Sequence, residues 1–137
     1  MQMDSSKRIA IATVLLIGSC CFMIAAWYLH LKFERWSMLK AIGLSWLIAG
    51  CEYCLQVPAN RIGHDAGLSP ARLRAIAEVC IVTAFLVFQT IVLRKDLLMN
   101  HILGFAVVVI GVFLILFGPF NAVILKAPQW IADTNSK

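Results

Sequence analysis

The chain has 137 residues, of which 61% are hydrophobic and 14% charged, and its mean hydropathy is +0.87. Soluble domains average about 45–50% apolar and about 25% charged residues, and a core of this size cannot bury so much apolar surface, which excludes an ordinary soluble domain. The net charge of +5 does not indicate nucleic-acid binding, because the basic residues lie at the ends of apolar runs, as membrane anchors do.

Four long apolar runs follow one another along the chain. A helix needs about 20 apolar residues to cross a hydrocarbon layer, and each run meets or approaches that length. The sequence therefore predicts an all-α integral membrane protein, a single four-transmembrane-helix bundle over residues 1–137. The predicted spans are Ile9–Leu31, Met38–Val57, Arg72–Leu93 and Asn100–Ile124. The connections are short except for Pro58–Ala71, so function must lie inside the bundle, at its loops or at a partner interface.

The first run, Ile9–Leu31, begins like a signal peptide, and Ile17–Cys20 fits a lipoprotein cleavage box. The apolar part of a signal peptide spans about 7–15 residues, whereas this run continues well past that length. We therefore expect a retained first helix. Trp27 near its end is typical of an interfacial aromatic belt, and His30 is expected to hydrogen-bond at the same interface.

The second run contains the polar residues Glu52, Gln56 and Asn60 at intervals of four. These side chains share one face if the helix continues past Pro58, which a membrane helix tolerates when neighbours satisfy the freed carbonyl. An ionisable group inside a membrane faces the bundle interior or a wet cavity, and it marks a proton or ion site or an ion pair. The sequence therefore predicts that Glu52 points into the bundle.

Two interpretations of Glu52 stay open, because its own helix offers no basic partner within reach. One is a structural ion pair with Arg61, His64 or a group on another helix, and the other is a proton or cation site. The candidate substrate- or ion-binding residues are Glu52, Glu78, Gln56, Asn60, Arg61 and Tyr53.

The third run carries Glu78, which we expect at a depth similar to that of Glu52. Arg74 precedes it by four residues and can pair with it along one helix face, so a structural role and a functional one are both open. Of five cysteines, Cys51 and Cys54 form a C-x-x-C without further ligands. This pattern does not indicate zinc, and we interpret the cysteines as small packing residues. We predict no metal and no cofactor.

The fourth run has glycines at seven-residue intervals, Gly104, Gly111 and Gly118. Small residues allow helix backbones to approach closely in lipid. The glycine stripe therefore predicts either packing within the chain or the seam of a homodimer.

With four spans, both termini share one side with the Pro58–Ala71 connection. That side carries more basic residues than the other, which favours cytoplasmic termini. The bias is small, so a single orientation and insertion in both orientations stay open. The basic residues on the two sides are Lys7, Arg8, Arg61, Arg72, Arg74, Lys126 and Lys137 against Lys32, Arg35, Lys40, Arg94 and Lys95.

The strings AWYLHLKF, SWLIAGCEYCLQVPANRIG and AIAEVC resemble an uncharacterised small four-helix membrane family assigned to the drug/metabolite transporter (DMT) superfamily. The resemblance spans nearly the whole chain. It implies a fold like that of the small multidrug resistance proteins, with four short helices that pair into a homodimer in the bacterial inner (plasma) membrane. Those relatives exchange protons for organic cations through a glutamate in the first helix, whereas the first predicted helix of this chain has no acid.

The resemblance and the residues together favour a small secondary transporter, proton-coupled or facilitative, for a small cationic or polar solute. The alternative is a non-transporting integral membrane subunit or accessory protein of a larger complex. An enzyme is not expected, because no nucleophile–base pair, metal set or phosphate loop is visible. The expected partners are membrane lipid, a second copy of the chain and a small solute.

Overall fold

The computed structural model describes residues 4–118, which form four α-helices and one short 3-10 helix, with no strand in this range. The elements are α1 (Ser5–Tyr28), η1 (Leu29–Lys32), α2 (Met38–Asp65), α3 (Pro70–Ile91) and α4 (Met99–Phe117). This confirms the predicted all-α four-helix fold. Three helices, namely α1 with η1, α2 and α4, are long and apolar enough to cross a membrane. The third predicted span, α3, is not among these three, and its first turns carry Arg72, Arg74 and Glu78.

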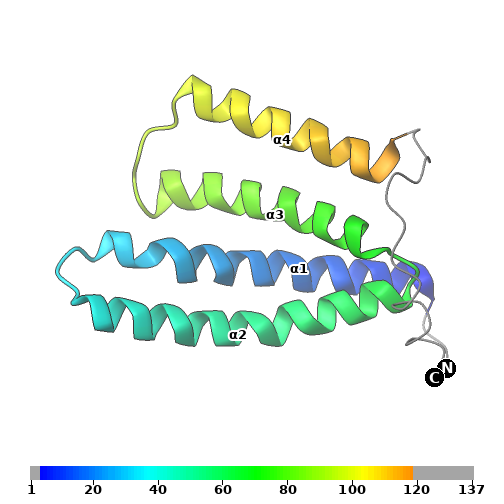
Figure 1. Ribbon diagram of the computed structural model, residues 1–137, viewed down its shortest axis with the longest axis horizontal. Helices are drawn as coiled ribbons and strands as arrows, with labels where there is room; N and C mark the ends of the chain where they lie inside the picture. The colour runs from blue at the N-terminus through cyan, green and yellow to red at the C-terminus, as the bar shows by residue number, and fades with distance from the viewer. Residues whose placement is uncertain (1–3, 119–137) are drawn as a thin grey trace, which may run out of the picture.

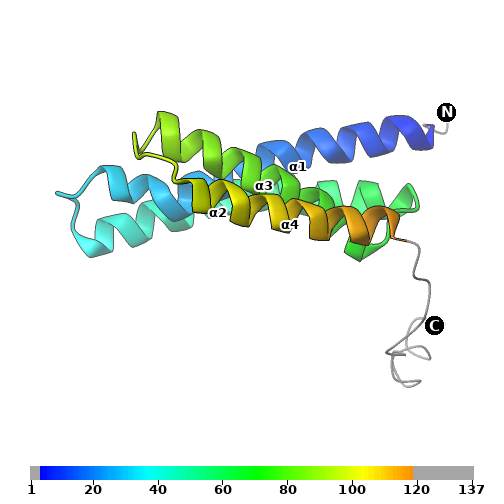
Figure 2. The same cartoon turned by 90° about the horizontal axis from the view of Figure 1, so that it is seen from above.

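The helices lie side by side in the order α4, α3, α1, α2 (Figure 1), and they cross at an angle rather than running parallel (Figure 2). α1 packs against both α2 and α3, whereas α4, within the described residues, contacts α3 alone among the helices. An aromatic row joins three helices: the ring of Tyr28 lies 5.2 Å from that of Phe85, which lies 5.9 Å from that of Phe105. α1 is therefore the central helix of the bundle.

The core lies where α1 meets α2 and α3, and it consists largely of small side chains. Its buried members are Leu16, Cys20, Ala59, Leu73 and Ala77. Close approach of backbones through small residues is how membrane helices gain packing contacts, since lipid gives no hydrophobic drive between helices. The core therefore holds three helices together at the end of the molecule nearest the connection between α2 and α3.

The predicted long connection Pro58–Ala71 is wrong, because α2 continues through Pro58 to Asp65 and the connection is only Ala66–Ser69. Gly67, with φ of +93°, ends α2: its N–H donates to the carbonyl of His64, and that of Leu68 donates to the carbonyl of Gly63. This is the Schellman arrangement, which places glycine in the left-handed region.

The next helix begins at once. The Ser69 side chain accepts a hydrogen bond from the Arg72 N–H, and Pro70 takes the first helical position, as these residues do at helix starts. α3 ends at Ile91, two residues before the predicted limit, and α1 begins at Ser5, before the predicted Ile9. α4 ends at Phe117; of the rest of its predicted span, Gly118 is not helical and residues 119–124 lie outside the described residues.

A glycine sets the distance between α2 and α3 beside their connection. A Cβ added at Gly63 would lie 2.5 Å from Leu73 Cδ2 and 3.5 Å from Ala12 Cβ. Gly63→Leu should therefore force α3 and α1 away from α2, and overpacking of this kind destabilises by about 1–3 kcal/mol. Thermal unfolding in mild detergent measures the effect.

The matched control for Gly63 is Gly50→Leu on the same helix, where an added Cβ meets nothing within 4 Å. We expect a lower unfolding temperature for the Gly63 variant alone. Equal unfolding temperatures for the two variants would contradict the close approach of these helices.

Candidate functional site

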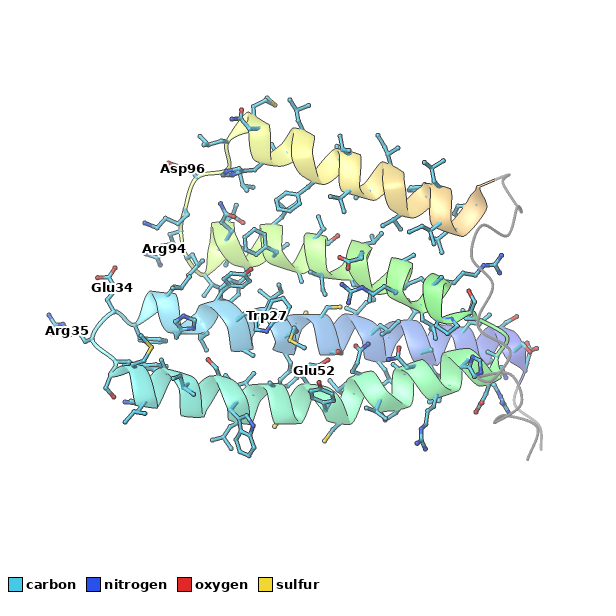
Figure 3. The ribbon with its side chains drawn as sticks, in the orientation of Figure 1. Trp27, Glu34, Arg35, Glu52, Arg94 and Asp96 are labelled. Carbon is cyan, nitrogen blue, oxygen red and sulfur yellow. The ribbon has the colours of Figure 1, made fainter. Side chains whose placement is uncertain are left out.

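The candidate site centres on Glu52, which lies at the middle of α2 and is only 1% exposed. Figure 3 shows it in the central part of the molecule, away from Glu34, Arg35, Arg94 and Asp96, which lie in the two connections at one end of the bundle. The extended α2 places Glu52 about 20 Å from the helix end at 1.5 Å per residue. Glu52 therefore lies further from the end of its helix than the predicted end at Val57 implied.

A serine of the neighbouring helix provides the hydrogen-bond partner of Glu52. Ser19 on α1 is 1% exposed, and its hydroxyl oxygen lies 2.5 Å from Glu52 Oε1 and 2.6 Å from Gln56 Oε1. Gln56 in turn contacts Asn60, with 3.4 Å between Gln56 Nε2 and Asn60 Oδ1. These four polar side chains thus form a row of hydrogen bonds that runs from the buried carboxyl group toward the end of α2.

The Ser19 hydroxyl carries a single proton, which limits how this row can be bonded. If Glu52 is protonated, its O–H donates to Ser19, Ser19 donates to Gln56 Oε1, and the Gln56 amide donates to Asn60. If Glu52 is ionised, Ser19 donates to Glu52, and the Gln56 amide must turn over so that its N–H₂ group donates to Ser19. The protonation state of Glu52 therefore decides which group donates and which accepts in each of these hydrogen bonds.

The second oxygen of Glu52, Oε2, lacks a hydrogen-bond partner in the described part of the chain. Oε2 is buried, and nothing within residues 4–118 donates a hydrogen bond to it. Glu52 lines a cavity of about 200 Å³ between α1, α2 and α3, together with Ser19 and Trp27. A buried carboxylate with one oxygen unsatisfied is costly, so an ionised Glu52 requires a cation or ordered water beside Oε2.

A larger cavity of about 510 Å³ adjoins the first one at the connection between α2 and α3. The two cavities share Gln56, Arg74 and Ala77 as lining residues. We refer to the larger one as the mouth; the charged and polar residues around it are Gln56, Asn60, Arg61, His64, Asp65 and Arg74. The cavity that Glu52 lines therefore adjoins a polar region between α2 and α3, although the Glu52 side chain itself is buried.

The predicted candidate residues fall into two groups. Glu52 and Gln56 line the inner cavity and Asn60 and Arg61 line the mouth, while Tyr53 is 62% exposed but also lines the inner cavity. Glu78 lines neither of these cavities.

For both Glu78 and Glu52 the sequence left open a structural ion pair and a functional role, and the structure shows an ion pair for Glu78 alone within the described residues. Glu78 pairs with Arg74 along α3, which is the structural alternative for that residue. Glu52 makes no ion pair with Arg61 or His64 within the described residues. The reason is distance, because Arg61 lies about 13 Å further along the axis of the same helix.

Sequence reasoning did not select Ser19, although it is the direct partner of Glu52. A serine flanked by apolar residues inside a span was the available signal, since a buried hydroxyl needs a partner on a neighbouring helix. The packing interpretation of the cysteines holds for Cys20, which is buried, whereas Cys21, Cys51 and Cys54 are exposed on the bundle surface.

Ser19→Ala should destabilise the protein by about 1–3 kcal/mol, because it leaves the buried Glu52 Oε1 without its hydrogen-bond partner. Ser45→Ala is the matched control, since Ser45 on α2 is half-buried and lines a different cavity. Thermal unfolding of both variants in detergent measures the difference. Equal stability of the two would show that Ser19 does not satisfy the carboxyl group.

Comparison with known proteins agrees with this architecture. The model of the family described as "Putative member of DMT superfamily (DUF486)" matches residues 12–116, which is most of the chain and includes Ser19, Glu52 and Arg74. Searches against curated proteins and against solved structures found no match. The apolar helices and the family together identify an integral membrane protein. The chain belongs to this DUF486 family of the drug/metabolite transporter superfamily.

Proposed function

We propose that the chain is a small secondary transporter of a small cationic or polar solute and that its transport is coupled to protons at Glu52. The observation that carries the proposal is a buried carboxyl group whose Oε2 has no hydrogen-bond partner within residues 4–118 and which lines a cavity that adjoins a polar mouth. Intramembrane acids in such cavities mark ion and proton pathways.

The coupling follows from the two bonding arrangements around Ser19. With a proton on Glu52, the row of hydrogen bonds is closed without an external cation. Without that proton, the buried negative charge is stabilised by a cation or ordered water beside Oε2, and a cationic solute can take this place. Proton and cationic solute therefore compete for one carboxyl group, which is the condition for exchanging one against the other.

Transport also needs access from the opposite side of the bundle. Trp27 lines the Glu52 cavity and also a cavity of about 380 Å³ near the connection between α1 and α2. That second cavity is lined by His30 and Ser45, and His30 Nδ1 is buried without a partner within residues 4–118. Trp27 lines both cavities, which supports a path for the solute along α1 and α2 in which the Trp27 side chain separates the two cavities.

Glu52→Gln keeps the size and hydrogen bonding of the side chain but removes its titration. Purified protein in sealed vesicles should take up solute in response to a pH gradient, and the variant should lose that response by about tenfold or more, as removal of a positioned proton-transfer group does. Glu34→Gln in the exposed connection between α1 and α2 is the control and should behave like the unmodified chain.

Unfolding temperatures measured on the same preparations separate transport from folding. A Glu52→Gln variant with normal pH-driven uptake would remove Glu52 from the mechanism. A protein that binds none of a set of small cationic and polar solutes and takes up none of them into vesicles would favour the accessory role.

We further propose a homodimer whose seam includes Gly104, Gly111 and Gly118, with the termini in the cytoplasm. An added Cβ at Gly104 or Gly111 meets nothing within 4 Å, so neither glycine is needed for packing inside the chain. α4 meets α3 through the adjacent stripe with Phe105 and Val112. Glycine at position 118 is also required locally, because an added Cβ would clash with the carbonyl oxygen of Leu114.

Gly111→Leu should weaken this association at least tenfold, because a bulky side chain holds the two backbones apart in lipid. Crosslinking through single cysteines introduced beside Gly111 measures it in membranes. Phe117→Leu, at an exposed position of the same helix, is the control. Unchanged crosslinking in the Gly111 variant would exclude this seam.

A further inference from the structure

We propose that the cavity beside Glu52 binds a small zwitterion, with its ammonium group at Glu52 and its carboxylate at Arg74. This inference deepens the proposed function, on which it rests, by naming the chemical class of the solute. It starts from two opposite charges that line one cavity of about 200 Å³, Glu52 from α2 and Arg74 from α3.

The two charged groups do not neutralise each other. No ion pair joins them within the described residues. Glu52 Oε2 accepts no hydrogen bond from residues 4–118. Arg74 uses Nη2 on Glu78, and a guanidinium group has five N–H donors, so donors remain for a second anion.

The position of Arg74 makes it the natural partner for a carboxylate. It lines both the inner cavity and the mouth, so it lies where the two cavities join. Arginine matches a carboxylate with two parallel hydrogen bonds, which gives orientation as well as affinity. Arg61 at the mouth adds positive charge along the path of entry.

Other residues that line the cavity suit an ammonium group. Glu52 supplies the negative charge, and Trp27 lines the same cavity, where an aromatic face attracts cations. The volume limits the ligand, because a water molecule occupies about 30 Å³ in the liquid and drug-sized sites span about 300–1,000 Å³. A short amino-carboxylate fits this space, and a bulky organic cation does not.

Binding of three matched ligands tests the proposal: a short amino acid, the amine that lacks its carboxylate, and the carboxylate that lacks its amine. Isothermal titration with purified protein in detergent gives each dissociation constant. The amino acid should bind at least tenfold more tightly than either fragment, since a hydrogen-bonded charged group contributes about that factor. An amine that binds as tightly as the amino acid would overturn the proposal, and so would no binding by any short zwitterion.

Two variants identify the residue that holds the carboxylate. Arg74→Gln should weaken the amino acid about tenfold or more and leave the amine unchanged, whereas Glu52→Gln should weaken both. Glu78→Gln breaks the same ion pair but keeps the guanidinium group, so it should retain the affinity for the amino acid. Equal losses in the Arg74 and Glu78 variants would show a structural effect of the pair and overturn the assignment.

The binding and uptake measurements test the zwitterion site and the transporter function separately. Zwitterion binding that depends on Arg74 without uptake in vesicles would keep the site and overturn the transporter. Uptake of a cation that is unaffected by Arg74→Gln would keep the transporter and overturn the zwitterion. Circular dichroism and size-exclusion profiles confirm folding, and Arg74→Lys, which keeps the charge without the planar fork, should show an intermediate affinity.

Discussion

A carboxyl group in the middle of a membrane helix must find polar partners, because its transfer from water into an apolar interior is costly. In this bundle the partner is the hydroxyl group of Ser19 on the adjacent α1. The contact requires α1 and α2 to lie close together, and the small residues Cys20 and Ala59 in the neighbouring core allow that approach. The register between the two helices is thus tied to one hydrogen bond, and the cavities on both sides depend on it.

The same carboxyl group explains why α2 is polar along one side. Gln56 and Asn60 continue the hydrogen-bonded chain from Ser19 toward the mouth, and this is geometrically possible only because the helix passes through Pro58 without ending. A proline inside a membrane helix is tolerated when neighbouring groups compensate for the missing N–H. The polar residues of α2 therefore form a continuous face instead of a helix followed by a loop.

Hydropathy predicted the helices well, because the length of an apolar run is a direct physical requirement for crossing a membrane. The end of α2 was harder to predict, since Pro58 and the polar residues after it are typical of the end of a membrane-spanning helix. The signal that fixes the true end is local: Gly67 in the left-handed region and Ser69 with Pro70 at the next helix start. These residues show turn chemistry that hydropathy does not measure.

The site was predictable in part. The spacing of Glu52, Gln56 and Asn60 placed them on one face, and this face does line the connected cavities. Ser19 and Trp27 could not be assigned to the site because contacts between helices depend on which faces meet, and periodicity within one helix does not specify this. The role of Arg74 at the junction of two cavities likewise follows only from the crossing of α3 over α1.

The tight connection Ala66–Ser69 fixes the end at which α2 and α3 meet, so a change in the angle between the two helices would be centred there. Its backbone groups are capped, and Gly63 and Leu73 are in close contact beside it, so this end is the pivot as long as the turn holds. Arg61 lies about 6 Å from the end of α2 and Glu52 about 20 Å from it. A tilt of about 5° between the two helices would shift the first by about 0.5 Å and the second by about 1.7 Å. Such a pivot leaves the width of the entrance nearly constant and varies the space around the buried acid.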